Sequence, residues 1–222
     1  MASTTYPPGG PAVSATAGAV GARARAGARA EVNPQIAATQ TGIWVCVCAI
    51  FMCFAAFVSA LVVREGTGAD WQRLVLPRVL YFNTLILLAS SYTLGVCSRR
   101  FAAAVRQHAP DGYAQFPRAL PWLYATIFLG AIFIFGQWLA WRTLSVEGLY
   151  LATNPSSSFF YVLTAMHGLH VLGGMAGLIY AARRLGRGVV SAQVSALGAA
   201  STYWHFMGVL WVFLFLVMAM RL

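Results

Sequence analysis

The architecture follows from residues 158–182, SFFYVLTAMHGLHVLGGMAGLIYAA, a stretch of 25 residues that contains no charged side chain. At about 1.5 Å of rise per residue, a helix of this length is longer than the roughly 30 Å hydrocarbon core of a bilayer. We therefore expect these residues to form one tilted membrane-spanning helix.

The middle of this stretch carries polar and small residues. His167 and His170 are three positions apart, so they share one face of a helix. Gly168 stands between them, and Gly173 and Gly177 have the four-residue spacing that lets a neighbouring helix approach closely in lipid. Because polar groups at this depth need partners, this face is predicted to contact protein rather than acyl chains.

Four further charge-free stretches of about 20 residues lie on either side of it in the sequence. The 222-residue chain is 59% hydrophobic and 9% charged, whereas a soluble domain is about 25% charged. The predicted fold is all-α, a polytopic membrane protein with a bundle of five transmembrane helices in a domain of residues 39–222. The expected spans are about 42–63, 79–98, 120–141, 158–182 and 199–220.

Residues 1–38 are rich in Ala, Gly, Pro and Arg and contain no apolar run long enough for the core of a signal peptide. We interpret them as a disordered cytoplasmic tail. An organelle transit peptide is the alternative, although the Gly and Pro residues disfavour the amphipathic helix that such a peptide forms.

The distribution of arginine predicts the topology. The net charge is +10, and ten of the fifteen basic residues fall in the tail, the second loop and the fourth loop, which share one side of the membrane. The positive-inside rule therefore predicts a cytoplasmic N-terminus and a C-terminus outside. Arginines beside membrane spans meet anionic lipid, so no nucleic-acid partner is expected.

The predicted spans lack the residues that most chemistry needs. Proton-coupled transporters usually place Asp, Glu, Lys or Arg inside the bundle, and this chain has none there. A nucleophile beside a base, or metal-ligand spacing, is not visible either. We expect no catalytic residue, cofactor or metal site in this chain. We interpret the four cysteines as small buried apolar residues, namely Cys46, Cys48, Cys53 and Cys97.

Polar residues in the other spans are interpreted as hydrogen-bonding groups that join helices. They include Asn83, Ser90, Ser91, Gln137 and His205. Counting the rise per residue places His170 and His205 at nearly the same depth. A hydrogen bond between these two rings is expected, and axial ligation of a haem iron by the pair is the alternative.

Four segments, in order, resemble subunit III of the haem-copper oxidases, the family that serves cytochrome c and quinol oxidases. They are LPRVLYFNTLILLASSYTL from Leu76, FGQWLAW from Phe135, FFYVLTAMHGLHVLGG from Phe159, and YWHFMGVLWVFLF from Tyr203. The last contains a Trp-His-Phe segment like that of the family, at Trp204 and His205. The resemblance covers about residues 40–220 and is to the five-span bacterial form.

This resemblance implies a non-redox accessory subunit of a cytochrome c oxidase that reduces O2 to water in a bacterial plasma membrane. Such a subunit packs beside catalytic subunit I and subunit II, which carry the haem and copper. It stabilises the catalytic subunit and bound phospholipid, and it supports proton uptake. The chain would then belong to a proton-translocating oxidoreductase without having catalytic residues of its own.

The resemblance also implies roles for individual residues. Helix contacts are expected from His167, Gly168, His170, Gly173, Gly177, Trp204, His205, Asn83, Ser90, Ser91 and Gln137. Lipid phosphates are expected to meet arginines near the inner interface, namely Arg99, Arg100, Arg183 and Arg184.

The chain departs from the family pattern at several positions. Many members carry a buried glutamate in the first of these five spans, where Ala49 or a close neighbour stands here. Gly208 stands where an acid often follows the Trp-His-Phe segment, and Gln137 favours cytochrome c oxidase over the quinol branch. The alternatives are the small subunit of a quinol oxidase or nitric oxide reductase and, from another class, a membrane anchor that binds haem b.

Overall fold

The computed structural model describes residues 34–68, 71–108, 119–185 and 190–222. The chain divides into two compact units, residues 1–38 and 39–222, and the contacts described below lie within the second. Of the expected disordered tail of residues 1–38, residues 1–33 lie outside the described residues, and Pro34 to Ala38 are the first residues of a helix.

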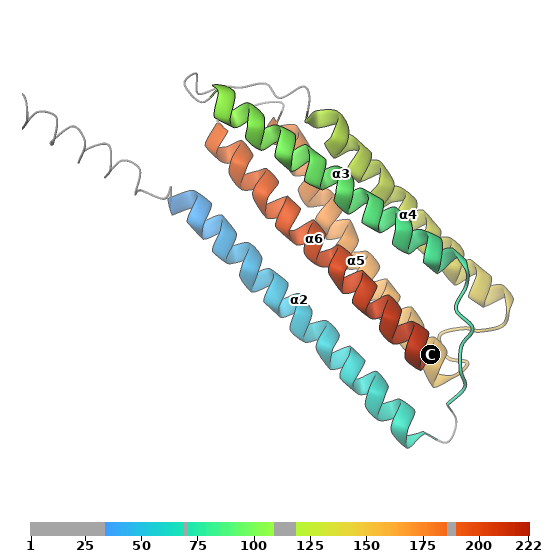
Figure 1. The fold of residues 1–222 in the computed structure, drawn as a ribbon. Coiled ribbons are helices and arrows are strands. Elements are labelled where there is room, and N and C mark those ends of the chain that lie inside the picture. The colour runs from blue at the N-terminus through green and yellow to red at the C-terminus, as the bar shows by residue number, and fades with distance from the viewer. Residues whose placement is uncertain (1–33, 69–70, 109–118, 186–189) are drawn as a thin grey trace, which may run out of the picture. The chain divides into compact units, whose positions relative to one another are not determined.

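Five long helices, and no strand, make up the described residues (Figure 1). By length and composition, all five can cross a membrane, which confirms the predicted all-α fold with five transmembrane helices. Each helix contains the corresponding expected span and extends beyond it. The helices are α2 (Pro34–Thr67), α3 (Val79–His108), α4 (Leu120–Val146), α5 (Pro155–Leu185) and α6 (Val190–Arg221).

The turn between α4 and α5 explains why α5 starts three residues before the expected span. Gly148 has a φ of 77°, a left-handed conformation that glycine adopts without steric cost and that ends α4. Asn154 then caps α5, because its Oδ1 accepts the backbone N–H of Ser157 at 2.7 Å. Pro155 follows at the first helical position, where its missing N–H is not needed.

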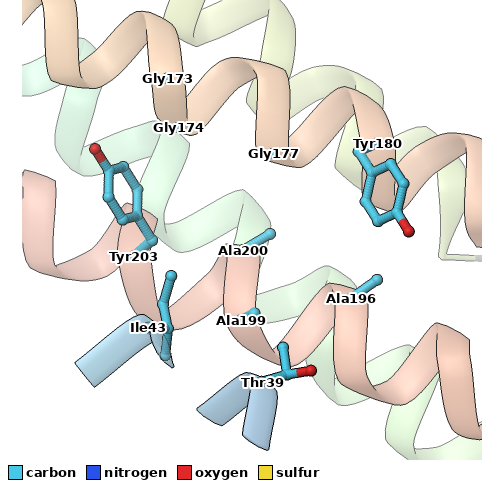
Figure 2. A pocket seen from close by; sticks show the side chains of 10 residues that line it. All are labelled: Thr39, Ile43, Gly173, Gly174, Gly177, Tyr180, Ala196, Ala199, Ala200 and Tyr203. Atoms are coloured by element: carbon cyan, nitrogen blue, oxygen red, sulfur yellow. The ribbon is translucent and has the colours of Figure 1, made fainter. Parts of the chain in front are cut away.

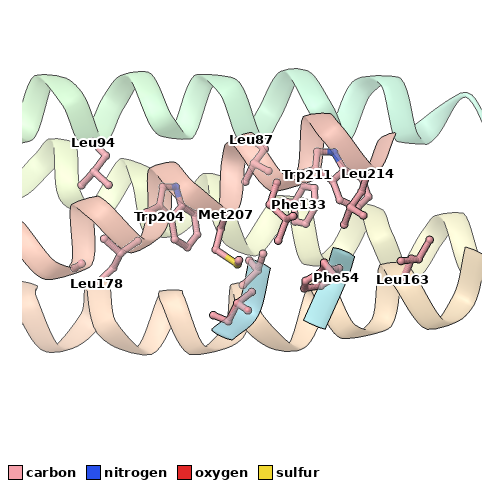
Figure 3. Packing of buried hydrophobic residues seen from close by; sticks show 14 of the residues in the cluster. Phe54, Leu87, Leu94, Phe133, Leu163, Leu178, Trp204, Met207, Trp211 and Leu214 are labelled. Atoms are coloured by element: carbon pink, nitrogen blue, oxygen red, sulfur yellow. The ribbon is translucent and has the colours of Figure 1, made fainter. Parts of the chain in front are cut away.

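Helices α3 to α6 pack closely around one core, in the pairs α3–α4, α4–α5, α5–α6 and α3–α6. Figure 3 shows side chains of α6 pointing inward between the other helices, among them Trp204, Met207, Trp211 and Leu214. Trp204 and Trp211 are at most 1% exposed. These two indoles are the largest of the fully buried side chains in the described part of the chain.

Hydrogen bonds between side chains join these four helices. The indole N–H groups of Trp204 and Trp211 donate to Ser90 Oγ and Thr84 Oγ1, both at 3.1 Å. Thr93 and Thr126 share a hydrogen bond of 2.9 Å between α3 and α4. In an apolar medium each such bond is retained because its alternative is an unpaired polar group.

Helix α2 contacts α5 and α6 mainly through apolar side chains on one face, including the buried Ile50, Phe54 and Leu61. At its C-terminal end Glu65 Oε2 lies 3.3 Å from Arg221 Nη1 of α6. Cys46 and Cys48 are exposed on α2, whereas Cys97 of α3 is buried. The interpretation of all four cysteines as buried residues is therefore wrong for Cys46 and Cys48, because only one face of α2 is covered by other helices.

The segment after α2 is joined to the ends of α5 and α6. Leu74 donates its backbone N–H to the carbonyl oxygen of Leu222, and Trp71 Nε1 donates to that of Arg221 at 3.3 Å. Ser156 Oγ donates to the carbonyl oxygen of Gln72. The ends of α2, α5 and α6 are thus joined by several bonds on this side of the bundle.

Candidate functional site

The two histidines of α5 lie on one face of the helix, as the sequence predicts, because both contact Phe54. His167 is fully buried, and its ring centroid lies 4.8 Å from that of Trp211, 5.8 Å from Phe133 and 6.4 Å from Phe54. His170 is half-buried, with its ring 5.6 Å from Phe54. His167 is therefore enclosed by aromatic rings from α2, α4 and α6.

The prediction of a hydrogen bond between His170 and His205 is wrong. His170 Nδ1 instead lies 2.7 Å from the carbonyl oxygen of Met166, one turn earlier in its own helix. The contact with α6 comes from Tyr203, whose hydroxyl donates to the carbonyl oxygen of His170 at 3.0 Å. His205 stays half-buried because the neighbouring Trp204 takes the position that faces the core.

Asn83, Ser90 and Ser91 of α3 all lie at helix contacts. Asn83 Nδ2 donates to the carbonyl oxygen of Phe133 at 3.3 Å, and its side chain lies against Gly136. Ser90 accepts the indole N–H of Trp204, and Ser91 lies close to Gly208 of α6.

Gln137 of α4 is 3% exposed, and neither of its polar side-chain atoms has a hydrogen-bond partner among the described residues. The same is true of both ring nitrogens of His167.

The closest approach of helices occurs at glycines that the spacing argument did not select. A methyl group at Gly136 would lie 2.0 Å from Asn83 Oδ1, and one at Gly130 would lie 2.8 Å from the Trp204 ring. One at Gly174 would lie 3.0 Å from the Tyr203 ring, whereas one at Gly177 would meet nothing within 4 Å. In this chain the Gly173 and Gly177 pair therefore does not support a close helix contact.

Gly173 and Gly177 line a pocket instead, between α2, α5 and α6 (Figure 2). Its volume is about 350 Å³. The wall consists almost entirely of apolar and small residues, with Tyr180 and Tyr203 as the two large side chains. Its lining residues are Thr39, Ile43, Gly173, Gly174, Gly177, Tyr180, Ala196, Ala199, Ala200 and Tyr203.

The four selected arginines are exposed, and aromatic rings hold two of them. Arg184 donates from Nε to the hydroxyl of Tyr180 at 3.0 Å, so it lies next to a residue of the pocket. The guanidinium of Arg100 lies 5.0 Å from the Trp122 ring centroid. Arg183 precedes Arg184 in the last turn of α5, and Arg99 precedes Arg100 in the C-terminal third of α3.

Sequence reasoning missed several threonines that accept or share hydrogen bonds between helices. Thr164 of α5 accepts the indole N–H of Trp141 at 3.0 Å, and Thr84 of α3 accepts that of Trp211. Thr126 of α4 shares a hydrogen bond with Thr93 of α3. A usable signal is present, since each buried tryptophan carries one N–H that needs an acceptor at the same depth.

No group of three or more His, Cys, Asp or Glu side chains lies close enough to hold a metal ion in the part of the chain that the structure describes. What the arrangement offers is a bundle interior with few polar groups, an apolar pocket of about 350 Å³, and exposed arginines in the C-terminal parts of α3 and α5.

Comparison with known proteins identifies the family. Residues 39–221 match the family described as cytochrome c oxidase subunit III. A probable cytochrome c oxidase subunit 3 of Mycobacterium tuberculosis is 31% identical over 191 residues, which cover 83% of this chain and 88% of that protein. Cytochrome c oxidase subunit 3 of Thermostichus vulcanus is 31% identical over 172 residues, covering 73% of this chain and 77% of the relative.

A third relative comes from the quinol branch. A probable quinol oxidase subunit 3 of Staphylococcus epidermidis is 27% identical over 179 residues, covering 78% of this chain and 84% of that protein. The family match spans all five helices and contains every motif that the sequence singled out. The chain belongs to the cytochrome c oxidase subunit III family and is an accessory subunit of a haem-copper oxidase.

Proposed function

We propose that this accessory subunit serves an oxidase that takes electrons from cytochrome c in a bacterial plasma membrane. It packs beside subunit I and subunit II, stabilises subunit I and helps to sustain proton uptake, with its N-terminus in the cytoplasm. The observation that carries the proposal is the family match over residues 39–221. A supporting role also agrees with the five predicted spans, which carry no charged side chain.

The electron donor is tested by purifying the oxidase in mild detergent through a tag on this chain. We expect a larger haem-bearing subunit to co-purify and to consume O2 with reduced cytochrome c. Consumption with a quinol but not with cytochrome c would replace this proposal with the quinol oxidase. A b-type haem that stays with the isolated chain and is lost on His170→Ala would replace it with a haem anchor.

We further propose that the pocket between α2, α5 and α6 holds an acyl chain of a phospholipid (Figure 2). An apolar pocket of about 350 Å³ within membrane-spanning helices is in contact with lipid tails unless protein fills it. Arg184 is bonded to Tyr180 at one end of this pocket, where it is placed to meet the phosphate.

A matched pair of glycine variants tests this lipid site. Gly177→Leu fills the pocket, whereas Gly95→Leu adds the same side chain to α3, where a Cβ also meets nothing within 4 Å. We expect Gly177→Leu to lose about one tightly bound phospholipid per oxidase in native mass spectrometry, and Gly95→Leu to keep it. Equal lipid content in the two variants would refute the site and leave the family assignment intact.

A further inference from the structure

Gln137 and His167 are the clearest exceptions to the good hydrogen bonding of the bundle. They are 3% and 0% exposed, and all four of their polar side-chain atoms lack a partner among the described residues. Buried polar groups in folded proteins are nearly always hydrogen-bonded, to protein or to ordered water. Both residues are therefore expected to have a partner outside the described residues of this chain.

The two residues lie at the same level of neighbouring helices. Helices α4 and α5 run in opposite directions, and Trp141 Nε1 of α4 donates to Thr164 Oγ1 of α5. Gln137 is one turn from Trp141, and His167 is one turn from Thr164 in the same direction along the bundle. The ring contact of 5.8 Å between His167 and Phe133, one turn further along α4, agrees with this register.

Gly168, the residue after His167, has open space beside it. It lies at the level of Gln137, and it is buried. A methyl group on its Cα would nevertheless meet no atom within 4 Å outside its own stretch of helix. A buried glycine that faces open space next to two polar side chains leaves room for a small polar molecule rather than for a lipid tail.

We propose that Gln137, His167 and Gly168 form a binding site for one water molecule that joins α4 to α5 inside the bundle. Such a water makes about three hydrogen bonds in proteins. The amide of Gln137 supplies a donor and an acceptor, and neutral imidazole supplies one of each. The absence of a side chain at Gly168 is then what admits the water.

The direction in which one substitution changes stability distinguishes a bound water from an empty space. Alanine is favoured over glycine inside a helix, so Gly168→Ala should raise stability if its methyl group merely enters open space. If a water is bound there, the methyl group displaces it and leaves Gln137 and His167 unpaired. We expect the purified oxidase to release the tagged Gly168→Ala chain at a temperature lower by about 2–4 °C.

Gly95→Ala is the matched control, because a methyl group there also meets nothing within 4 Å and no unpaired residue is adjacent. It should leave the release temperature unchanged or raise it. Gln137→Met should lower that temperature in the native chain and have a much smaller effect when combined with Gly168→Ala. A rise on Gly168→Ala equal to that of the control, or strictly additive effects, would overturn the proposal.

A cryo-electron microscopy map of the assembled oxidase, sharp enough to show other internal waters, gives an independent test. We expect a density peak at about 2.7–3.2 Å from the Gln137 amide and from one ring nitrogen of His167. The Gly168→Ala oxidase should lack that peak. A direct bond between the amide and the imidazole, with no density between the helices, would show that no water site exists.

Discussion

Helices α3 to α6 and helix α2 are held in different ways. The four helices α3 to α6 share a closed core and are cross-linked by indole and hydroxyl hydrogen bonds, such as Trp204 to Ser90. Helix α2 relies on the packing of Phe54 and a few aliphatic residues, with one ion pair at its end. It is flanked by apolar pockets of about 350 and 270 Å³.

This difference separates two tasks within one subunit. Hydrogen bonds inside lipid have strict geometry, so they fix the register of α3 to α6 against one another. Apolar packing with pockets on both sides tolerates changes of side chain. The four helices form the closely packed part of the subunit, and α2 borders the pocket in which we propose a lipid tail.

Removal of the central indole should have the largest effect. Trp211 is fully buried, contacts the rings of Phe133 and His167, and donates to Thr84. Trp211→Ala is expected to lower the free energy of unfolding by about 3–5 kcal/mol, measured by SDS titration in mixed micelles.

Phe213 provides the comparison on the same helix, because it is 46% exposed and lines the pocket beside α2. Phe213→Ala should cost far less than Trp211→Ala, since its space is already partly open. Similar losses for the two variants would contradict the distinction between the tightly packed core and the α2 side.

The next largest loss of stability is expected when a methyl group is added to a closely packed glycine. A methyl group at Gly136 would collide with Asn83, and moving that side chain breaks its bond to the carbonyl oxygen of Phe133. Gly136→Ala should therefore cost about 1–3 kcal/mol in the same titration. Gly177→Ala, on the α2 side, should be neutral or slightly stabilising, and a comparable loss there would mean that α2 packs as tightly as α4.

The fold could be predicted from the sequence, because charge-free stretches longer than the bilayer core admit one solution, a helix. The close contacts could not. The small-xxx-small spacing selected Gly173 and Gly177, yet the tight approaches occur at Gly130, Gly136, Gly174 and Gly208. Spacing identifies residues that permit close contact, whereas the bulk of the facing Asn83 and Trp204 decides which of them are used.

The sequence indicates which polar residues form hydrogen bonds between helices, but not which residue each of them bonds. Depth counting placed His170 and His205 together, but it carries no information on the direction in which each side chain points. Trp204 occupies the core-facing position, so His205 is turned aside and Tyr203 reaches His170 instead. One residue along a helix changes the direction by about 100°, and a correct depth therefore does not determine a contact.

A single polar cross-link should have a moderate effect. The bond from Trp204 Nε1 to Ser90 Oγ joins α6 to α3 inside the core. A double-mutant cycle with Trp204→Phe and Ser90→Ala should give a coupling energy of about 0.6–1.7 kcal/mol, the range for hydrogen bonds between membrane helices. A coupling near zero would show that this bond adds nothing to the packing of α6 against α3.

The smallest effect is expected where α2 has its polar contact. The 3.3 Å ion pair of Glu65 with Arg221 has side chains that are 20% and 49% exposed, so solvent and salt screen it. Glu65→Gln should change the free energy of unfolding by about 0–1 kcal/mol, and the change should shrink further at high salt. A loss above that range that persists in high salt would mean that a buried polar contact, rather than side-chain packing, attaches α2. The division between a cross-linked four-helix core and an apolar boundary helix would then be wrong.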